Sequence, residues 1–159
     1  MNPVSLWQNA LIRVTRIAHK PVLSLPLLLL LSACSGNPPD NLGLHDGHLA
    51  ACPDSPNCVN SQATDSRHAI APLLLTGTAE QTQARLKAIL KSEPRVNLVG
   101  EAPGYLRAEF SSRLMRFVDD VEFHIGATAV DVRSASRLGY KDFDVNRERI
   151  EYLRQRLSE

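Results

Sequence analysis

The segment from Arg133 to Tyr140 has the composition expected of an anion-binding element. Within eight residues it supplies two guanidiniums, two hydroxyls and a glycine that allows close approach to the backbone. Guanidinium groups bind carboxylates and phosphates through paired hydrogen bonds. Donors near the start of the expected last helix add to this, since a helix N-terminus favours negative charge. The predicted site comprises Arg133, Ser134, Ser136, Arg137, Asn146 and Arg147. Alternatively, the arginines tie loops together through backbone carbonyls and the asparagine pins a turn.

A second group of polar residues alternates along three expected strands and therefore shares one sheet face. Such residues can pair across strands. One interpretation is a solvated face, on which each ion pair contributes about 0–1 kcal/mol. The other is a site where carboxylates and arginines converge around a ligand. The face comprises Arg107, Glu109, Asp120, Glu122, His124, Asp131 and Arg133.

Catalytic nucleophiles and metal sites are weakly indicated. The Gly-x-Ser-x-Gly turn, the phosphate loop and the dinucleotide fingerprint are all absent from the sequence. Ser61, Asp65 and His68 are close along the chain, but fold geometry makes a triad, and His68 is expected to bond a nearby backbone group. Asp119 and Asp120 are adjacent in a strand, so they point to opposite faces and do not readily chelate one ion. We therefore expect no metal and no cofactor.

Residues 1–33 have the pattern of a secretory signal peptide. Basic residues precede an apolar run over 22–31, whereas a spanning helix needs about 20 residues. The ending Leu31-Ser32-Ala33-Cys34 resembles the lipobox of bacterial lipoproteins, which implies acylation of Cys34 and cleavage before it. Ser35, in place of Asp, favours the outer over the inner membrane by the same resemblance. The expected divisions are a signal peptide (1–33), a flexible tether rich in Gly and Pro (34–50) and a periplasm-facing domain (51–159).

With Cys34 assigned to lipid, Cys52 and Cys58 remain as an even pair in an oxidising compartment. The residues between them are turn formers, so a disulfide across this short loop is expected. Free thiols or a zinc site are the alternatives, the latter drawing on His45 and His48 as further ligands.

Charge argues against nucleic-acid binding. Three of the 18 Lys and Arg residues and none of the 17 Asp and Glu residues lie in 1–33, which leaves a formal charge of −2 on the rest of the chain. A nucleic-acid-binding domain is instead usually basic. The expected partners are the membrane, through the lipid anchor, and an anionic envelope ligand or an envelope protein.

Hydrophobic periodicity predicts an α+β fold, with an antiparallel sheet of about four to five strands and two helices on one face. Residues 51–70 are expected to be an irregular loop. Thr78 and Gln81 form a capping-box pattern before a helix that stops ahead of Pro94. The strands are expected at 72–75, 95–100, 105–110, 117–125 and 129–136, with Phe117 on the apolar face and a hairpin at 126–128. The last helix is expected over 144–157, with Val145, Ile150, Leu153 and Leu157 on its apolar side.

Four separated motifs resemble those of the domain of unknown function 1499 (DUF1499) family. They are the stretch Cys52-Pro53-Asp54-Ser55-Pro56-Asn57-Cys58 with the residues to Ala63, the stretch 119–123, the stretch 132–140, and Asp142 with 145–150. The likeness spans about residues 50–157. Asn60 stands where the family pattern has Ser, and Asp144 where it has Gly. The resemblance implies fold and boundaries, and no activity.

The sequence favours a membrane-anchored envelope lipoprotein whose domain binds an anionic ligand or a protein partner without catalysis. One alternative is an envelope hydrolase that uses Asp120, Glu122, His124 and Arg133. Another is a structural or assembly factor. A concave pocket with convergent polar groups would favour binding or catalysis over scaffolding.

Overall fold

The computed structural model describes residues 36–159, which belong to one compact unit. The predicted signal peptide and the lipidation of Cys34 lie outside the described residues. Among residues 36–159, no helix is both long and apolar enough to cross a bilayer. The elements are β1 (Cys58–Asn60), β2 (Leu73–Leu74), α2 (Ala79–Ser92), β3 (Val96–Ala102), β4 (Tyr105–Ser111), β5 (Val118–Ile125), β6 (Ala129–Ser136) and α3 (Val145–Ser158).

The strands form one six-stranded sheet in the order β1-β6-β5-β4-β3, with β2 also paired to β6. Every pairing is antiparallel. The α+β prediction is confirmed, although the sheet has six strands rather than four to five. The additional strand, β1, lies within the expected loop over 51–70 and pairs with the end of β6. Three residues are too few to show an alternating pattern, and turn formers precede them. The sequence pattern therefore does not predict this strand.

Both helices pack on the same face of the sheet over a shared core that includes Leu86, Phe123, Ile150 and Leu153. The predicted capping box is confirmed, because Thr78 and Gln81 bond each other's backbone at the start of α2. The register of α3 differs from expectation. Asn146 is buried whereas Val145 is 44% exposed, because the Asn146 side chain accepts a hydrogen bond from Ser134 of β6.

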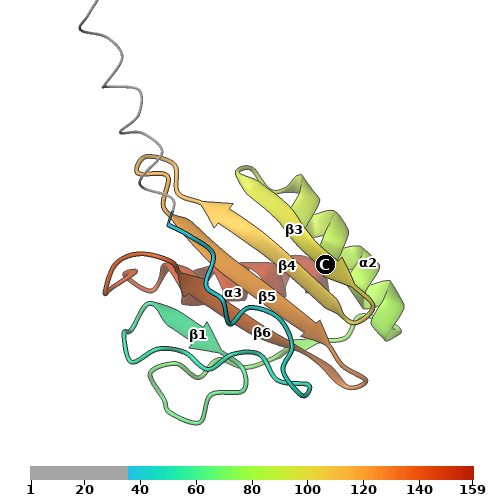
Figure 1. Cartoon of the computed structure of the whole chain (residues 1–159). Coiled ribbons are helices and arrows are strands. Elements are labelled where there is room, and N and C mark those ends of the chain that lie inside the picture. The colour runs from blue at the N-terminus through green and yellow to red at the C-terminus, as the bar shows by residue number, and fades with distance from the viewer. Residues whose placement is uncertain (1–35) are drawn as a thin grey trace, which may run out of the picture. The chain divides into compact units, whose positions relative to one another are not determined.

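The opposite face of the sheet is covered by residues 36–53, which cross in front of β5 and β6 while α3 lies behind (Figure 1). The backbone N–H of Gly43 donates to Glu122 Oε1 at 2.6 Å, and Leu49 is buried. A flexible tether was expected over 34–50, whereas its described part contacts the sheet. The physical reason is a buried carboxylate on the sheet that needs a donor, and this irregular segment supplies one. As a result, the centre of the polar face, at Asp120, Glu122 and Arg133, is buried.

Candidate functional site

The polar residues lie on one face of the sheet, and the centre of that face is buried. Asp120, Glu122 and Arg133 are almost fully buried, and Arg107 is partly buried. The strand register sets Arg107 and Arg133 on either side of Glu122. The centre of the face is therefore not solvated, because residues 36–53 cover it, whereas Glu109, His124 and Asp131 remain partly exposed at its edges. Buried charges need partners.

Arg137 and Asp120 form a bidentate ion pair on this face. Nε of Arg137 donates to Oδ2 of Asp120 at 2.7 Å, and Nη2 donates to Oδ1 at 2.9 Å. Arg137 also pairs with Glu109, and Arg107 approaches Oδ1 of Asp120 at 3.3 Å. These hydrogen bonds, that to Asp120 first, raise the pKa of Arg137 above its usual value. Asp120 is thus committed to two guanidiniums.

Glu122 gathers donors from three parts of the chain. Its Oε1 accepts from the Tyr105 hydroxyl at 2.7 Å and from the Gly43 N–H at 2.6 Å. Its Oε2 faces Nη1 of Arg133 at 3.4 Å, a long contact. Burial, followed by the hydrogen bond to Glu122, raises the pKa of Tyr105 above its usual value. The Tyr105 hydroxyl therefore keeps its proton and donates it in the hydrogen bond to Glu122.

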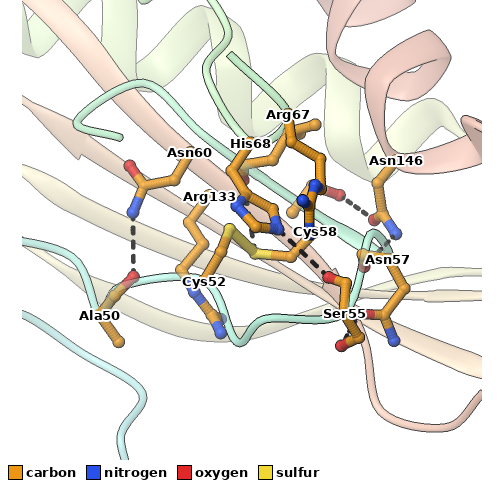
Figure 2. Close-up of a disulfide and its surroundings, with 12 residues drawn as sticks. Ala50, Cys52, Ser55, Asn57, Cys58, Asn60, Arg67, His68, Arg133 and Asn146 are labelled. Atoms are coloured by element: carbon orange, nitrogen blue, oxygen red, sulfur yellow. Dashed lines mark hydrogen bonds between the residues drawn. A yellow bond between two sulfur atoms is a disulfide. The ribbon is translucent and has the colours of Figure 1, made fainter. Parts of the chain in front are cut away.

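Among the described residues, Arg133 is the arginine of this face that buries a guanidinium nitrogen without an acceptor. Its side chain is 4% exposed, and its Nε finds no acceptor. Within residues 36–159, its side chain makes a single hydrogen bond, the long one to Glu122. It lines a cavity of about 330 Å³ together with Arg137, Asp120, Cys52 and Pro53. Figure 2 shows the Arg133 side chain next to Cys52 of the disulfide.

The predicted anion site of six residues is divided between the two faces of the sheet. Arg133 and Arg137 lie on the face covered by residues 36–53 and line the cavity. Ser134, Ser136 and Asn146 lie on the helix side, where Ser134 Oγ donates to Asn146 Oδ1 and Asn146 Nδ2 donates to Ser136 Oγ at 3.0 Å. Alternation along β6 causes this division, because odd and even positions point to opposite faces.

Asn146 and Arg147 act as structural ties. Nδ2 of Asn146 donates to the Asn57 carbonyl at 3.0 Å (Figure 2) and to Oδ2 of Asp142 at 2.8 Å. The guanidinium of Arg147 donates to the carbonyls of Ala69 and Arg67 at 2.8 and 3.0 Å. Asn146 therefore joins α3 to the loop that the disulfide closes, and Arg147 joins it to the segment after the disulfide.

The predicted disulfide between Cys52 and Cys58 is present. It commits both sulfurs, which removes them as zinc ligands. His68 closes the same region, since its Nε2 bonds the Ser55 carbonyl at 3.2 Å and its Nδ1 bonds Asp65 at 3.1 Å. The bond from His68 lowers the pKa of Asp65. The expected backbone contact of His68 is thus confirmed.

The polar face has a separate outer edge at His124. Nδ1 of His124 faces Oδ2 of Asp131 at 3.8 Å, and the Ser61 hydroxyl donates to Oδ1 of Asp131 at 2.9 Å. The carboxylate thus lies between serine and histidine. A nucleophilic triad requires the imidazole between the other two groups. This arrangement cannot activate Ser61 through His124.

Comparison with known proteins gives one family. The model of the family described as protein of unknown function (DUF1499) matches residues 48–157. The chain belongs to the DUF1499 family. No curated protein and no solved structure matches this chain.

The four predicted motifs meet in space, the second of them where Asp119 accepts a hydrogen bond from Arg149 of the last at 2.5 Å. Asn57 from the first motif receives a hydrogen bond from Asn146 of the last, and its own Nδ2 donates to the Gly139 carbonyl of the third at 2.6 Å. Asp144, where the resemblance led us to expect glycine, adopts φ +65°, a left-handed conformation that glycine takes readily. The motifs therefore describe, in large part, how the DUF1499 domain holds its own loops.

Several residues that hold the buried polar groups were not predicted from the sequence. Arg149 bonds Asp119 and Asn146 on the helix side of the sheet, and Tyr105 and Gly43 complete the Glu122 cluster. The Asp119–Arg149 pair could have been predicted, because Asp119 is a charged residue at an apolar position of β5. A charge that points into the core needs a buried partner, and an arginine of the last helix could supply one. The contact of Gly43 with Glu122 could not be predicted from residue types, because the donor is a backbone N–H.

Proposed function

We propose that this DUF1499 protein is a lipid-anchored lipoprotein of the bacterial envelope that binds the anionic group of an envelope ligand in the cavity beside Arg133. The anchor is Cys34, and the outer membrane is the expected location. The bound group is a phosphate or carboxylate, and the domain performs no chemistry on it. The lipobox supports the location, and the unused guanidinium edge of Arg133 supports the binding.

A comparison of Arg133 with Arg137 carries the binding proposal. Nε and Nη2 form the edge of a guanidinium that binds an oxyanion with two parallel hydrogen bonds. In Arg137 this edge is filled by Asp120. In Arg133 the Nε of the same edge is buried without an acceptor, beside a cavity. Leaving a charged donor unpaired is costly, so a bound oxyanion would restore its lost hydrogen bonds.

The alternative of a hydrolase at Asp120, Glu122, His124 and Arg133 receives less support from the geometry. A general base must present a free lone pair to its substrate. Asp120 instead accepts from Arg137 and Arg107, and Glu122 accepts from Tyr105, Gly43 and Arg133. Their carboxylates are held as acceptors for the fold.

Isothermal titration of the protein with inorganic phosphate and with acetate tests the binding. We expect saturable binding that Arg133→Met abolishes and that Arg85→Met leaves unchanged. Arg85 is a suitable control because it is an exposed arginine on α2. Absence of saturable binding to either anion would reject the proposal in favour of the structural or assembly role. Circular dichroism of each variant separates lost binding from lost fold.

Metabolic labelling with a clickable palmitate analogue tests the anchor. We expect label on the wild-type chain and none on Cys34→Ala, which should also keep its signal peptide. Fractionation of the labelled cells then assigns the inner or outer membrane. An unlabelled wild-type chain would reject the lipoprotein assignment and leave the anion-binding test unaffected.

A further inference from the structure

Two loops at one end of the sheet expose large apolar side chains. Residues 112–117 join β4 to β5, and residues 137–144 join β6 to α3. Leu114 is 86% exposed and Phe143 is 87% exposed. The exposed apolar residues of these loops are Leu114, Met115, Phe117, Leu138, Tyr140 and Phe143. We refer to this set as the loop patch. A concentration of exposed apolar residues marks an interaction surface.

The two loops are neighbours in space. The Arg137 N–H donates to the Val118 carbonyl at 3.1 Å, and the last β5–β6 pair is Asp119 with Ser136. Each loop therefore leaves the paired strands at the same end. Phe117 was expected on the apolar face of a strand, whereas it precedes β5 and is exposed, so it adds to this surface.

Cationic side chains surround the apolar ones. Arg113, Arg116 and Lys141 are exposed on the same loops. Of the two nearby acids, Asp142 is occupied by the N–H and the side chain of Asn146, while Asp144 is exposed. An apolar surface bordered by Lys and Arg matches an interface with anionic phospholipid, where the side chains enter the headgroup region and the cations meet phosphates.

The start of the described chain lies at the loop patch. A side chain added at Gly36 would touch Arg137 and Leu138, and the Gly36 carbonyl accepts from Arg137 Nη1 at 3.4 Å. The blue start of the coloured trace is correspondingly beside the β4–β5 loop in Figure 1. Two peptide units separate Gly36 from Cys34, and these can span at most about 7–8 Å. A lipid on Cys34 would therefore enter a bilayer next to these loops.

We propose that the loop patch docks on the surface of a phospholipid bilayer that contains anionic headgroups. In the cell this rests on the lipid anchor proposed above, which brings the surface to the membrane. Docking fixes the orientation of the domain, with the β5–β6 hairpin pointing away. The occupant is the lipid surface rather than a second protein, because Gly36, two residues after the proposed anchor, lies against Leu138 of the patch.

The test attaches the chain to vesicles chemically, so that its outcome is independent of acylation in cells. The chain from residue 34 retains the entire core, which lies between Val59 and Leu157. With Cys52 and Cys58 bridged, Cys34 is its single free thiol and can be coupled to a maleimide lipid. The vesicles contain phosphatidylethanolamine and phosphatidylglycerol. The single tryptophan of the sequence, Trp7, precedes residue 34, so one introduced tryptophan reports alone.

Leu114→Trp and Phe143→Trp place the reporter in the loop patch, and Leu74→Trp provides the matched control. Leu74 is 76% exposed and pairs with Ala129 at the start of β6, about 25 Å along the strand from the patch. We expect blue-shifted emission and quenching by brominated lipid at both patch positions, and neither at Leu74. Replacing Arg113, Arg116 and Lys141 by Gln should reduce the quenching.

Two results would overturn the proposal. One is equal quenching at all three positions, or quenching at none, in chains whose circular dichroism is native. The other is concentration-dependent dimerisation that Phe143→Ser abolishes while vesicle contact is absent, which would make the patch a protein interface. Loss of palmitate labelling in cells would reject the natural anchor and would leave the vesicle result standing.

Discussion

The apolar face of the sheet and the centre of its polar face are both buried, but by different physical means. The helix face is closed by α2 and α3 over apolar side chains such as Phe123 and Val132. The other face is closed by the irregular residues 36–53 over paired charges such as Asp120 and Arg137. Apolar burial is non-directional and adds up, whereas a buried charge depends on one particular partner. The faces should therefore respond differently to single and double substitutions.

The largest expected loss of stability comes from removing one partner of a buried ion pair, and it distinguishes the polar face from the apolar face. Asp120→Ala leaves Arg137 buried without its main carboxylate and should lower the free energy of unfolding by about 3–5 kcal/mol. Combining Asp120→Leu with Arg137→Met removes both charges and should cost less than the single change. On the helix face, Phe123→Ala should cost about 3–5 kcal/mol, and adding Val132→Ala should increase the loss. Urea denaturation measures all four, and a double variant on the polar face less stable than Asp120→Ala would contradict the comparison.

The disulfide is the second largest contribution on the polar side. Cys52→Ser with Cys58→Ser should lower stability by about 2–3 kcal/mol, because the unfolded chain regains the entropy of an open loop. Urea denaturation of the wild type with and without a reducing agent gives the matched measurement. Equal midpoints in the two conditions would show that the bridge contributes nothing to the fold.

Tyr105 makes the polar face sensitive to alkaline pH. Its pKa is raised, so the folded state keeps the phenol proton after the unfolded state has lost it near the ordinary value of 10.0. The stability from this hydrogen bond is thus complete below about pH 10 and is lost as pH rises further. Stability of the wild type should fall more steeply above pH 10 than that of Tyr105→Phe. Parallel pH profiles for the two proteins would refute this role.

The smallest expected effect concerns the turn before α3. Asp144 has φ +65°, and a β-branched residue there should be strained. Asp144→Val should lower stability by about 1–2 kcal/mol, while Asp144→Gly should keep or raise it. Thermal denaturation of the pair gives the result, and equal melting temperatures for the two variants would mean that the turn is relaxed.

The sequence predicts the layers of the fold well and the polar contacts poorly. Long alternating segments and the Thr78 capping box identify strands and helices, because these signals are local. The partners of Glu122 come from Tyr105, Arg133 and Gly43, and no spacing along the chain links them. Of the six residues of the predicted anion site, only Arg133 and Arg137 have side chains on the cavity side of the sheet, because alternation along β6 turns Ser134 and Ser136 toward Asn146 on the helix side.

The most direct test of anion binding is an NMR titration that follows the Nε–Hε signals of the arginines as inorganic phosphate is added. The account predicts a saturable shift of the Arg133 signal and little change for Arg137, whose Nε is already bonded to Asp120. An Arg133 signal that stays unchanged to saturating phosphate, or an equal response from every arginine, would contradict it.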